Sequence, residues 1–239
     1  MPEESLDDVS SPDVIDAGQA IIRAAVGAIP VLGSAAAELF SFVVTPPLEA
    51  RRTQWMNELA LEVDTLKSAV AGLDAESLSA NDDFLSAVAV AVGVATRTAQ
   101  DEKRAMLRNA VLNAALGRVP DFDMSVVFIG YLDYLSPLHV QILRAMDDPI
   151  AALDSVGSTL AETMYMGGPS QIVEEVFPQL KENRELYDFL WQDLSERRLV
   201  NGGLHITMTK EGALASRTSS LGKQFLKFVT APVELGGSL

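Results

Sequence analysis

Near the C-terminus, apolar residues at helical spacing are followed by a short alternating stretch and then by a second helical stretch. The break Asn201-Gly202-Gly203 is typical of a helix end, and a serine at position 219 or 220 can cap the next helix. This order predicts a winged-helix outline, which defines a fold and not an activity. The predicted elements are a helix over 186–200, a strand over 204–208, a turn at 210–212, an antiparallel return strand over 213–218 and a helix over 220–229.

A nearly continuous apolar stretch, residues 17–44, contains only two charged side chains, Arg23 and Glu38. Ile29–Gly33 includes a proline and a glycine and divides this stretch into two halves. Each half is apolar almost all round, which indicates burial on every side or contact with lipid. Neither half reaches the roughly 20 residues that a membrane-spanning helix needs. The sequence favours a buried hairpin and leaves open a hairpin that inserts into a membrane on activation. The candidate membrane-contacting residues are Ile21, Ile22, Val26, Ile29, Pro30, Val31, Leu32, Gly33, Leu39, Phe40, Phe42 and Val43.

The middle of the chain repeats helical patterns between short breaks that carry cap residues. Thr45-Pro46-Pro47 is expected to end the hairpin and to begin a helix that reaches about Gly72. Asn81 is expected to cap a further helix, and Ser136-Pro137 to start another. The helix after Asn81 is predicted to bury Phe84, Leu85, Val88, Val92 and Ala95.

These patterns predict a mainly α fold. We expect a helical bundle around the buried apolar N-terminal hairpin, followed by a small winged-helix-like α+β domain. The expected parts are a flexible acidic lead over 1–12, the bundle over 13–135, the winged-helix-like domain over 136–229 and a flexible tail over 230–239.

The distribution of charge narrows the range of partners. The net charge is −15, and the residues up to Arg184 carry 27 acidic against 12 basic side chains, whereas those from Glu185 onward carry six of each. The first three quarters of the chain therefore disfavour binding to nucleic acid or anionic lipid. The chain has no cysteine, which excludes disulfides and Cys-based zinc sites. An acidic N-terminus without a basic n-region argues against a secretory signal, so a cytoplasmic location is expected.

Few residues suggest chemistry. The two histidines, His139 and His205, have no carboxylate at ligand spacing, and we interpret them as a packing residue and an exposed strand residue. Asp121 and Asp123 give only a weak indication of a divalent-metal site. GxSxG, GxxxxGK[ST], GxGxxG and HExxH are absent from the sequence. We therefore expect neither catalysis nor a cofactor nor a bound metal.

Five stretches together resemble a known group of bacterial proteins. They are AIPVLGSAAAELF, PPLEARRTQWMNELA, DEKRAMLRNAVLNAAL, YLDYLSPLHVQILRAM and TSSLGKQFLKFV. The chain resembles uncharacterised helical proteins similar to the abortive-infection alpha (Abi-alpha) type, with a C-terminal winged-helix-like end. This resemblance implies a role in phage defence or the stress response, and it transfers no catalytic residue.

A winged helix raises the question of DNA binding. The helix before the wing offers Glu185, Asp188, Asp193 and Glu196, which would repel phosphates. We therefore favour a non-enzymatic interaction or defence protein whose winged-helix-like end binds another protein or a second copy of the chain. The alternatives are a membrane-permeabilising effector that uses residues 17–44 and a transcriptional regulator, with nucleic acid the less favoured partner. The candidate wing contacts are Arg197, Arg198, Lys210 and Arg217.

Overall fold

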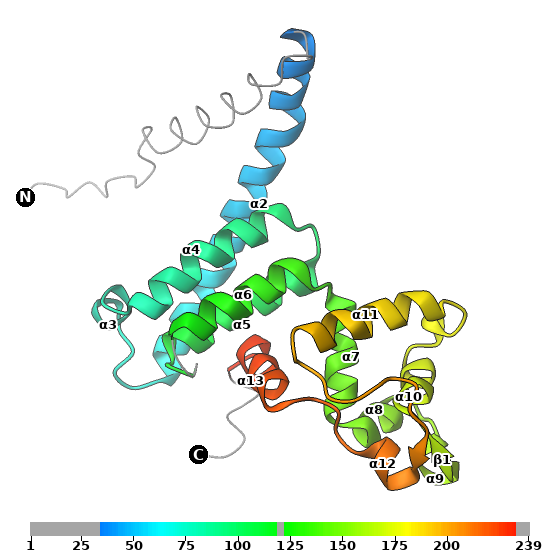
Figure 1. Ribbon diagram of the computed structural model, residues 1–239. Coiled ribbons are helices and arrows are strands. Elements are labelled where there is room, and N and C mark those ends of the chain that lie inside the picture. Colours follow the sequence, from blue (N-terminus) through cyan, green and yellow to red (C-terminus); the bar gives the residue numbers. More distant parts are fainter. Residues whose placement is uncertain (1–33, 119–121, 233–239) are drawn as a thin grey trace, which may run out of the picture. The chain divides into compact units, whose positions relative to one another are not determined.

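The computed structural model describes residues 34–118 and 122–232, and over these residues the protein is mainly helical, as predicted (Figure 1). The chain divides into two units, residues 1–54 and 55–239. The first helices are α2 (Ser34–Ala69), α3 (Ala75–Ser79), α4 (Asp82–Arg97), α5 (Asp101–Ala115), α6 (Phe122–Tyr134) and α7 (Pro137–Asp147). The remaining elements are α8 (Pro149–Ser155), α9 (Leu160–Thr163), β1 (Met166–Gly167), α10 (Pro169–Val176), η1 (Pro178–Leu180), α11 (Arg184–Glu196), β2 (Met208–Thr209), α12 (Lys210–Leu214) and α13 (Ser220–Val229).

Helix α2 differs from the expected hairpin. It runs without interruption through Thr45-Pro46-Pro47, so the predicted helix end at these residues is wrong. Each proline lacks one N–H donor, but the flanking residues are rich in Ala, Leu and Glu, which favour the helix on both sides. The break at Ile29–Gly33 lies outside the described residues. The side chains of 34–46 are outside them too, so burial of the apolar segment stays a prediction.

The bundle within 55–239 is built from α4, α5 and α6 together with the second half of α2. Trp55 is fully buried, and its Nε1 donates a hydrogen bond to the Arg104 carbonyl oxygen at 3.1 Å. Arg108 reaches from α5 to two carboxylates of α2, Glu58 at 2.6 Å and Glu62 at 2.8 Å. The predicted cap of α4 is confirmed, because the Asn81 side chain accepts a hydrogen bond from the backbone N–H of Phe84. Helix α2 is thus held to α5 by apolar burial and by one bridging arginine.

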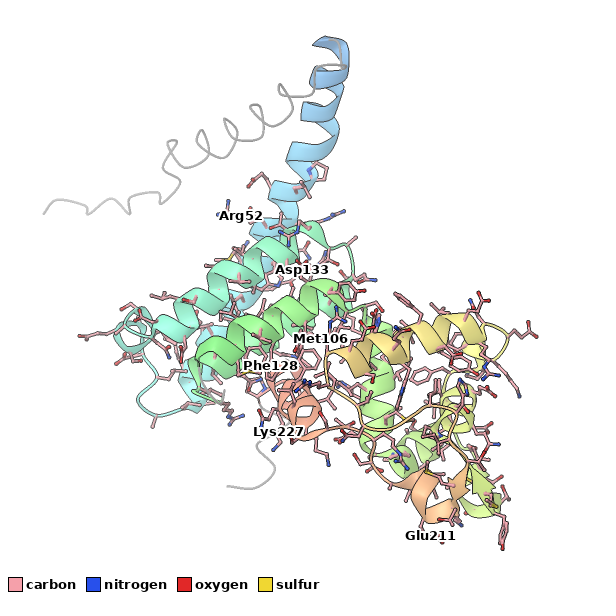
Figure 2. The ribbon with its side chains drawn as sticks, in the orientation of Figure 1. Arg52, Met106, Phe128, Asp133, Glu211 and Lys227 are labelled. Atoms are coloured by element: carbon pink, nitrogen blue, oxygen red, sulfur yellow. The ribbon has the colours of Figure 1, made fainter. Side chains whose placement is uncertain are left out.

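The C-terminal helix α13 packs on α5, α6 and α7. Phe128 of α6, labelled in Figure 2, lies against Phe225 and Phe228 of α13, and its ring centroid is 5.5 and 5.6 Å from theirs. The Asn113 amide nitrogen of α5 donates to carbonyl oxygens at the end of α13. Helix α13 therefore shares one core with helices from both predicted parts. The domain boundary predicted between residues 135 and 136 lies inside the unit 55–239.

The segment between α11 and α13 does not form the predicted hairpin. Strand β2 pairs antiparallel with β1, in the register Met166 with Thr209, and residues 210–214 form helix α12. Thr209 explains why β2 ends there and α12 begins. Its side chain accepts a hydrogen bond from the backbone N–H of Gly212 and so caps α12. The predicted turn at 210–212 and return strand over 213–218 are therefore wrong, although Val200 and Thr218 form an isolated antiparallel bridge.

Candidate functional site

A buried polar cluster joins α6, α7 and α11. At the start of α7, His139 Nδ1 lies 3.0 Å from the Ser136 backbone nitrogen and 2.8 Å from its hydroxyl oxygen. The backbone N–H can only donate, so Nδ1 is the unprotonated nitrogen and Nε2 carries the proton. Nε2 donates to Asp193 Oδ2 of α11 at 3.2 Å. Because both partners are almost fully buried, this bond links two helices in the interior.

The second oxygen of Asp193 faces the surface side of the cluster. Its Oδ1 accepts a hydrogen bond from the Tyr134 hydroxyl at 3.2 Å and lies 3.7 Å from Arg197 Nη1. The Arg197 guanidinium also lies over the Tyr134 ring, 3.8 Å from its centroid, and donates to the main-chain oxygen of Asp193. The buried carboxylate is therefore hydrogen-bonded at both oxygens and has a neighbouring cation, as a buried charge requires.

Burial sets the ionisation of this cluster. It lowers the pKa of His139, and the charges of Arg197 and Lys103 lower it further, against the opposing effect of Asp193. Lys103 is itself buried beside the cluster, and its Nζ donates to the Asp133 carbonyl oxygen at 3.2 Å. Burial also lowers the pKa of Lys103. His139 is consequently neutral at pH 7 and holds the tautomer that the hydrogen bonds indicate.

The sign of this shift predicts the pH dependence of stability. Since the pKa of His139 in the folded protein lies below the unfolded value of about 6.5, the unfolded state takes up the proton first. The free energy of unfolding should therefore fall as pH drops below about 6.5, by at most about 1.4 kcal/mol per pH unit. Urea unfolding at pH 7.5, 6.5 and 5.5 measures this loss, and a His139→Gln variant should lack it. A variant with the same slope as the unmodified chain would contradict the assignment.

Ser136, His139 and Asp193 have the composition of a hydrolytic triad but a different arrangement. The Ser136 hydroxyl and the Ser136 backbone N–H share the same imidazole nitrogen, so the serine is part of the N-terminal cap of α7. The hydroxyl of Ser136, both ring nitrogens of His139 and both carboxylate oxygens of Asp193 have hydrogen-bond partners within the cluster. The geometry therefore supports a role in holding α11 against α7.

Both histidines have carboxylate partners that sequence spacing does not reveal. The sequence predicts Asp193 to be one of the exposed acids of α11. In the structure its side chain is buried. His205 lies before β2 and not within a strand, and its Nε2 pairs with Asp188 of α11. The available signal was the position of Asp193 between Leu190 and Leu194, where a carboxylate on an apolar helix face needs a partner.

The exposed face of α11 combines apolar and acidic residues. Leu186 and Phe189 are 38% and 54% exposed, which is unusual for side chains of this size one turn apart. Glu185 and Glu196 are exposed on the same helix. We call these four residues together with Gln192 the α11 surface.

The four candidate wing contacts have separate roles. Arg197 is held by Asp193 and Tyr134. Arg217 turns inward, where one of its terminal nitrogens contacts Met208 Sδ and the Gly212 carbonyl oxygen. Lys210 Nζ donates to the Glu162 carbonyl oxygen at 3.3 Å, and Arg198 ends α11 in a left-handed conformation with φ of 57° and an exposed side chain. The guanidinium groups of Arg197 and Arg217 are thus committed to contacts within the chain.

An open groove of about 310 Å³ lies where α7, α8 and the end of α10 meet. Arg144 and Asp148 contribute charged side chains to a lining that is otherwise mostly apolar. The groove has no signature in the sequence because three separate helices form it. The lining residues are Gln141, Arg144, Ala145, Asp148, Ala151, Ala152, Ser155, Val176 and Phe177.

Two further features to consider are a metal site and a membrane-spanning helix. Within the described part of the chain, no group of three or more His, Asp or Glu side chains is placed to hold a metal ion, and Asp121 and the side chain of Asp123 lie outside that part. Over residues 34–118 and 122–232, no single helix is long and apolar enough to cross a bilayer. Among the helices that the structure describes, only Met124–Tyr134 of α6 taken together with α7, at 116° to each other, meet the requirement by length and composition.

Comparison with known proteins gives no relative: no family model, no curated protein and no solved structure matches the chain.

Proposed function

We propose that this chain is a non-enzymatic, mainly helical interaction protein whose C-terminal end binds another protein through the α11 surface. The observation that carries the proposal is the exposure of Leu186 and Phe189 between Glu185 and Glu196. Apolar side chains in an acidic setting suit a partner segment that is itself apolar with basic residues at its edges.

The C-terminal end is proposed to be winged-helix-like. Helices α7, α10 and α11 supply the three helices of this outline, with α8, α9 and β1 between the first two, and α11 takes the place of the recognition helix. The pairing of β1 with β2 and the Val200–Thr218 bridge support this assignment. The Tyr187 hydroxyl of α11 donates to Glu174 of α10 at 2.6 Å, and burial together with this carboxylate raises the pKa of Tyr187 to about 12.

Binding to DNA through α11 is disfavoured by the same surface. Phosphates would approach Glu185 and Glu196, while the guanidinium groups of Arg197 and Arg217 already have partners within the chain. Stable phosphate binding normally needs several free cations on one face. A protein partner is therefore favoured over a transcriptional operator.

A defence role of the Abi-alpha type, exercised in the cytoplasm, is part of the proposal. It is supported by the five stretches that resemble this group, above all the junction YLDYLSPLHVQILRAM. That junction includes Tyr134, Ser136 and His139, which fix α11 against α7. The residues that carry the resemblance therefore also position the proposed binding helix.

Residue-specific cross-linking in cells tests the α11 surface. A photo-reactive residue at Gln192 should give a discrete protein adduct, and Phe189→Glu should abolish it by weakening binding at least about tenfold. The matched control is Leu61→Glu, because Leu61 is 69% exposed on α2 and should leave the adduct intact.

Three results would overturn the proposal. They are the absence of any adduct, equal loss of the adduct in both variants, and sub-micromolar binding of a DNA duplex at physiological salt.

A further inference from the structure

Helices α4 and α6 lie side by side and run in the same direction, so that their exposed sides form one face (Figure 1). An ion pair joins their C-terminal ends, with Arg97 Nη2 3.0 Å from Asp133 Oδ2. Asp133 is labelled at the end of α6 in Figure 2. This surface is separate from the α11 surface, so a role for it is independent of the proposed function.

The face is apolar and carries no charge over most of its length. No charged residue lies between Asp83 and Arg97 on α4, or between Asp123 and Asp133 on α6. Leu85 is 46% exposed and Val127 39% exposed. We call this surface the α4–α6 face. Its residues are Leu85, Ala89, Val90 and Gly93 of α4 and Val126, Val127 and Gly130 of α6.

The sequence predicts that Leu85 is buried on α4, and this prediction is wrong, because Leu85 is exposed. The fully buried residues are the small side chains Ala87, Ala91 and Ala95 together with Val94. Small residues let α4 pack closely on its neighbours, so the larger Leu85 and Val90 are turned outward. Because α4 is apolar on nearly all sides, its periodicity could not distinguish the two orientations.

Two glycines make the centre of the face accessible to another helix. Gly93 precedes Arg97 by four residues and Gly130 precedes Asp133 by three, which places both glycines on the side where the two helices meet. A Cβ at Gly130 would meet no atom within 4 Å, and one at Gly93 would meet only Arg97 Nη1 at 3.6 Å. A side chain from an approaching helix can therefore descend between the flanking valines.

We propose that the α4–α6 face binds a second copy of this chain through the same face. With a net charge of −15, two copies repel each other over most of their surfaces, and contact is favoured where acids are missing. The C-terminal edge of the face supplies both signs, Arg97 and Asp133, so each copy offers an oppositely charged partner to the other at that edge. An anionic membrane would be repelled by the acids at Asp82 and Asp83.

The small size of the face is that of a weak dimer. Helices of 16 and 13 residues are about 24 and 20 Å long, and two helices side by side present about 400 Å². Two such faces bury roughly 800 Å² in total, which is less than a stable interface needs and falls in the range of weak, transient contacts. The dimer is therefore weak, with dissociation in the micromolar range.

Sedimentation velocity of the full chain between about 1 and 200 μM tests the proposal, since a micromolar dimer dissociates within this range. Gly130→Glu adds a charge where nothing blocks the side chain and favours the helix, so it should leave the monomer folded and weaken the dimer at least about thirtyfold. Leu61→Glu is the matched control and should change the dimer less than about twofold.

A cysteine at position 130 gives a second measurement. Because the chain has no cysteine of its own, Gly130→Cys should form a disulfide-linked dimer on mild oxidation and Leu61→Cys should not. A chain that stays monomeric at the highest concentration would overturn the proposal. So would a dimer that tolerates Gly130→Glu, or equal cross-linking of the two cysteine variants.

Discussion

Replacing Asp193 by alanine is expected to lower the free energy of unfolding by about 3 kcal/mol, because a buried cluster loses its shared acceptor. The carboxylate accepts hydrogen bonds from His139 Nε2 and from the Tyr134 hydroxyl. His139 is only 4% exposed, so water cannot take the place of the lost acceptor. Arg197 loses its ion-pair partner at the same time. Urea unfolding at pH 7.5 measures the loss.

The same helix provides the control. Asp188 is also an aspartate paired with a histidine, but its side chain is 42% exposed, and Asp188→Ala should cost less than about 1 kcal/mol. The double variant His139→Leu with Asp193→Leu should recover part of the loss, because it removes the unpaired donor together with the acceptor. Equal costs for Asp193→Ala and Asp188→Ala would mean that the cluster does not stabilise the junction.

The elements that depend on neighbouring residues could be predicted from the sequence. The caps of α4 and α13 are each a side-chain oxygen that accepts from a backbone N–H three residues later, at Asn81 and Ser219. Such contacts depend on local spacing alone, so they are visible in the chain itself. The mainly α fold follows from the same periodicity, as does α13 over Ser220–Val229.

The features that could not be predicted depend on residues far apart in the sequence. His139 and Asp193 are 54 positions apart, and no local pattern connects them. Strand β2 pairs with Met166–Gly167 and not with the residues that come after it, because Thr209 begins a helix at the position predicted to turn. Periodicity also fails where a helix is apolar on all sides, as α4 is, since neighbouring helices then decide which side is buried.

Replacing Asn113 by aspartate is expected to cost at least about 3 kcal/mol and to loosen the end of α13. The Asn113 amide nitrogen lies 2.9 Å from the Phe228 carbonyl oxygen, 2.8 Å from that of Thr230 and 3.2 Å from that of Lys227. A carboxylate would face these three acceptors at the negative end of the helix dipole. Chemical denaturation gives the cost, and amide hydrogen exchange should show faster exchange in α13 than in α4.

The pH dependence and a neighbouring asparagine distinguish this mechanism from a general packing defect. The surrounding carbonyls would raise the pKa of the new carboxyl in the folded state, so its cost is largest at neutral pH and shrinks as pH falls toward about 4, where the protonated acid can donate again. Asn109, one turn earlier on α5, donates to one described acceptor, the Val229 carbonyl oxygen at 3.1 Å, and is half-buried. Asn109→Asp should therefore cost about 1 kcal/mol. An Asn113→Asp cost that is independent of pH, or equal to that of Asn109→Asp, would show that α13 is held by its aromatic contacts and not by this amide.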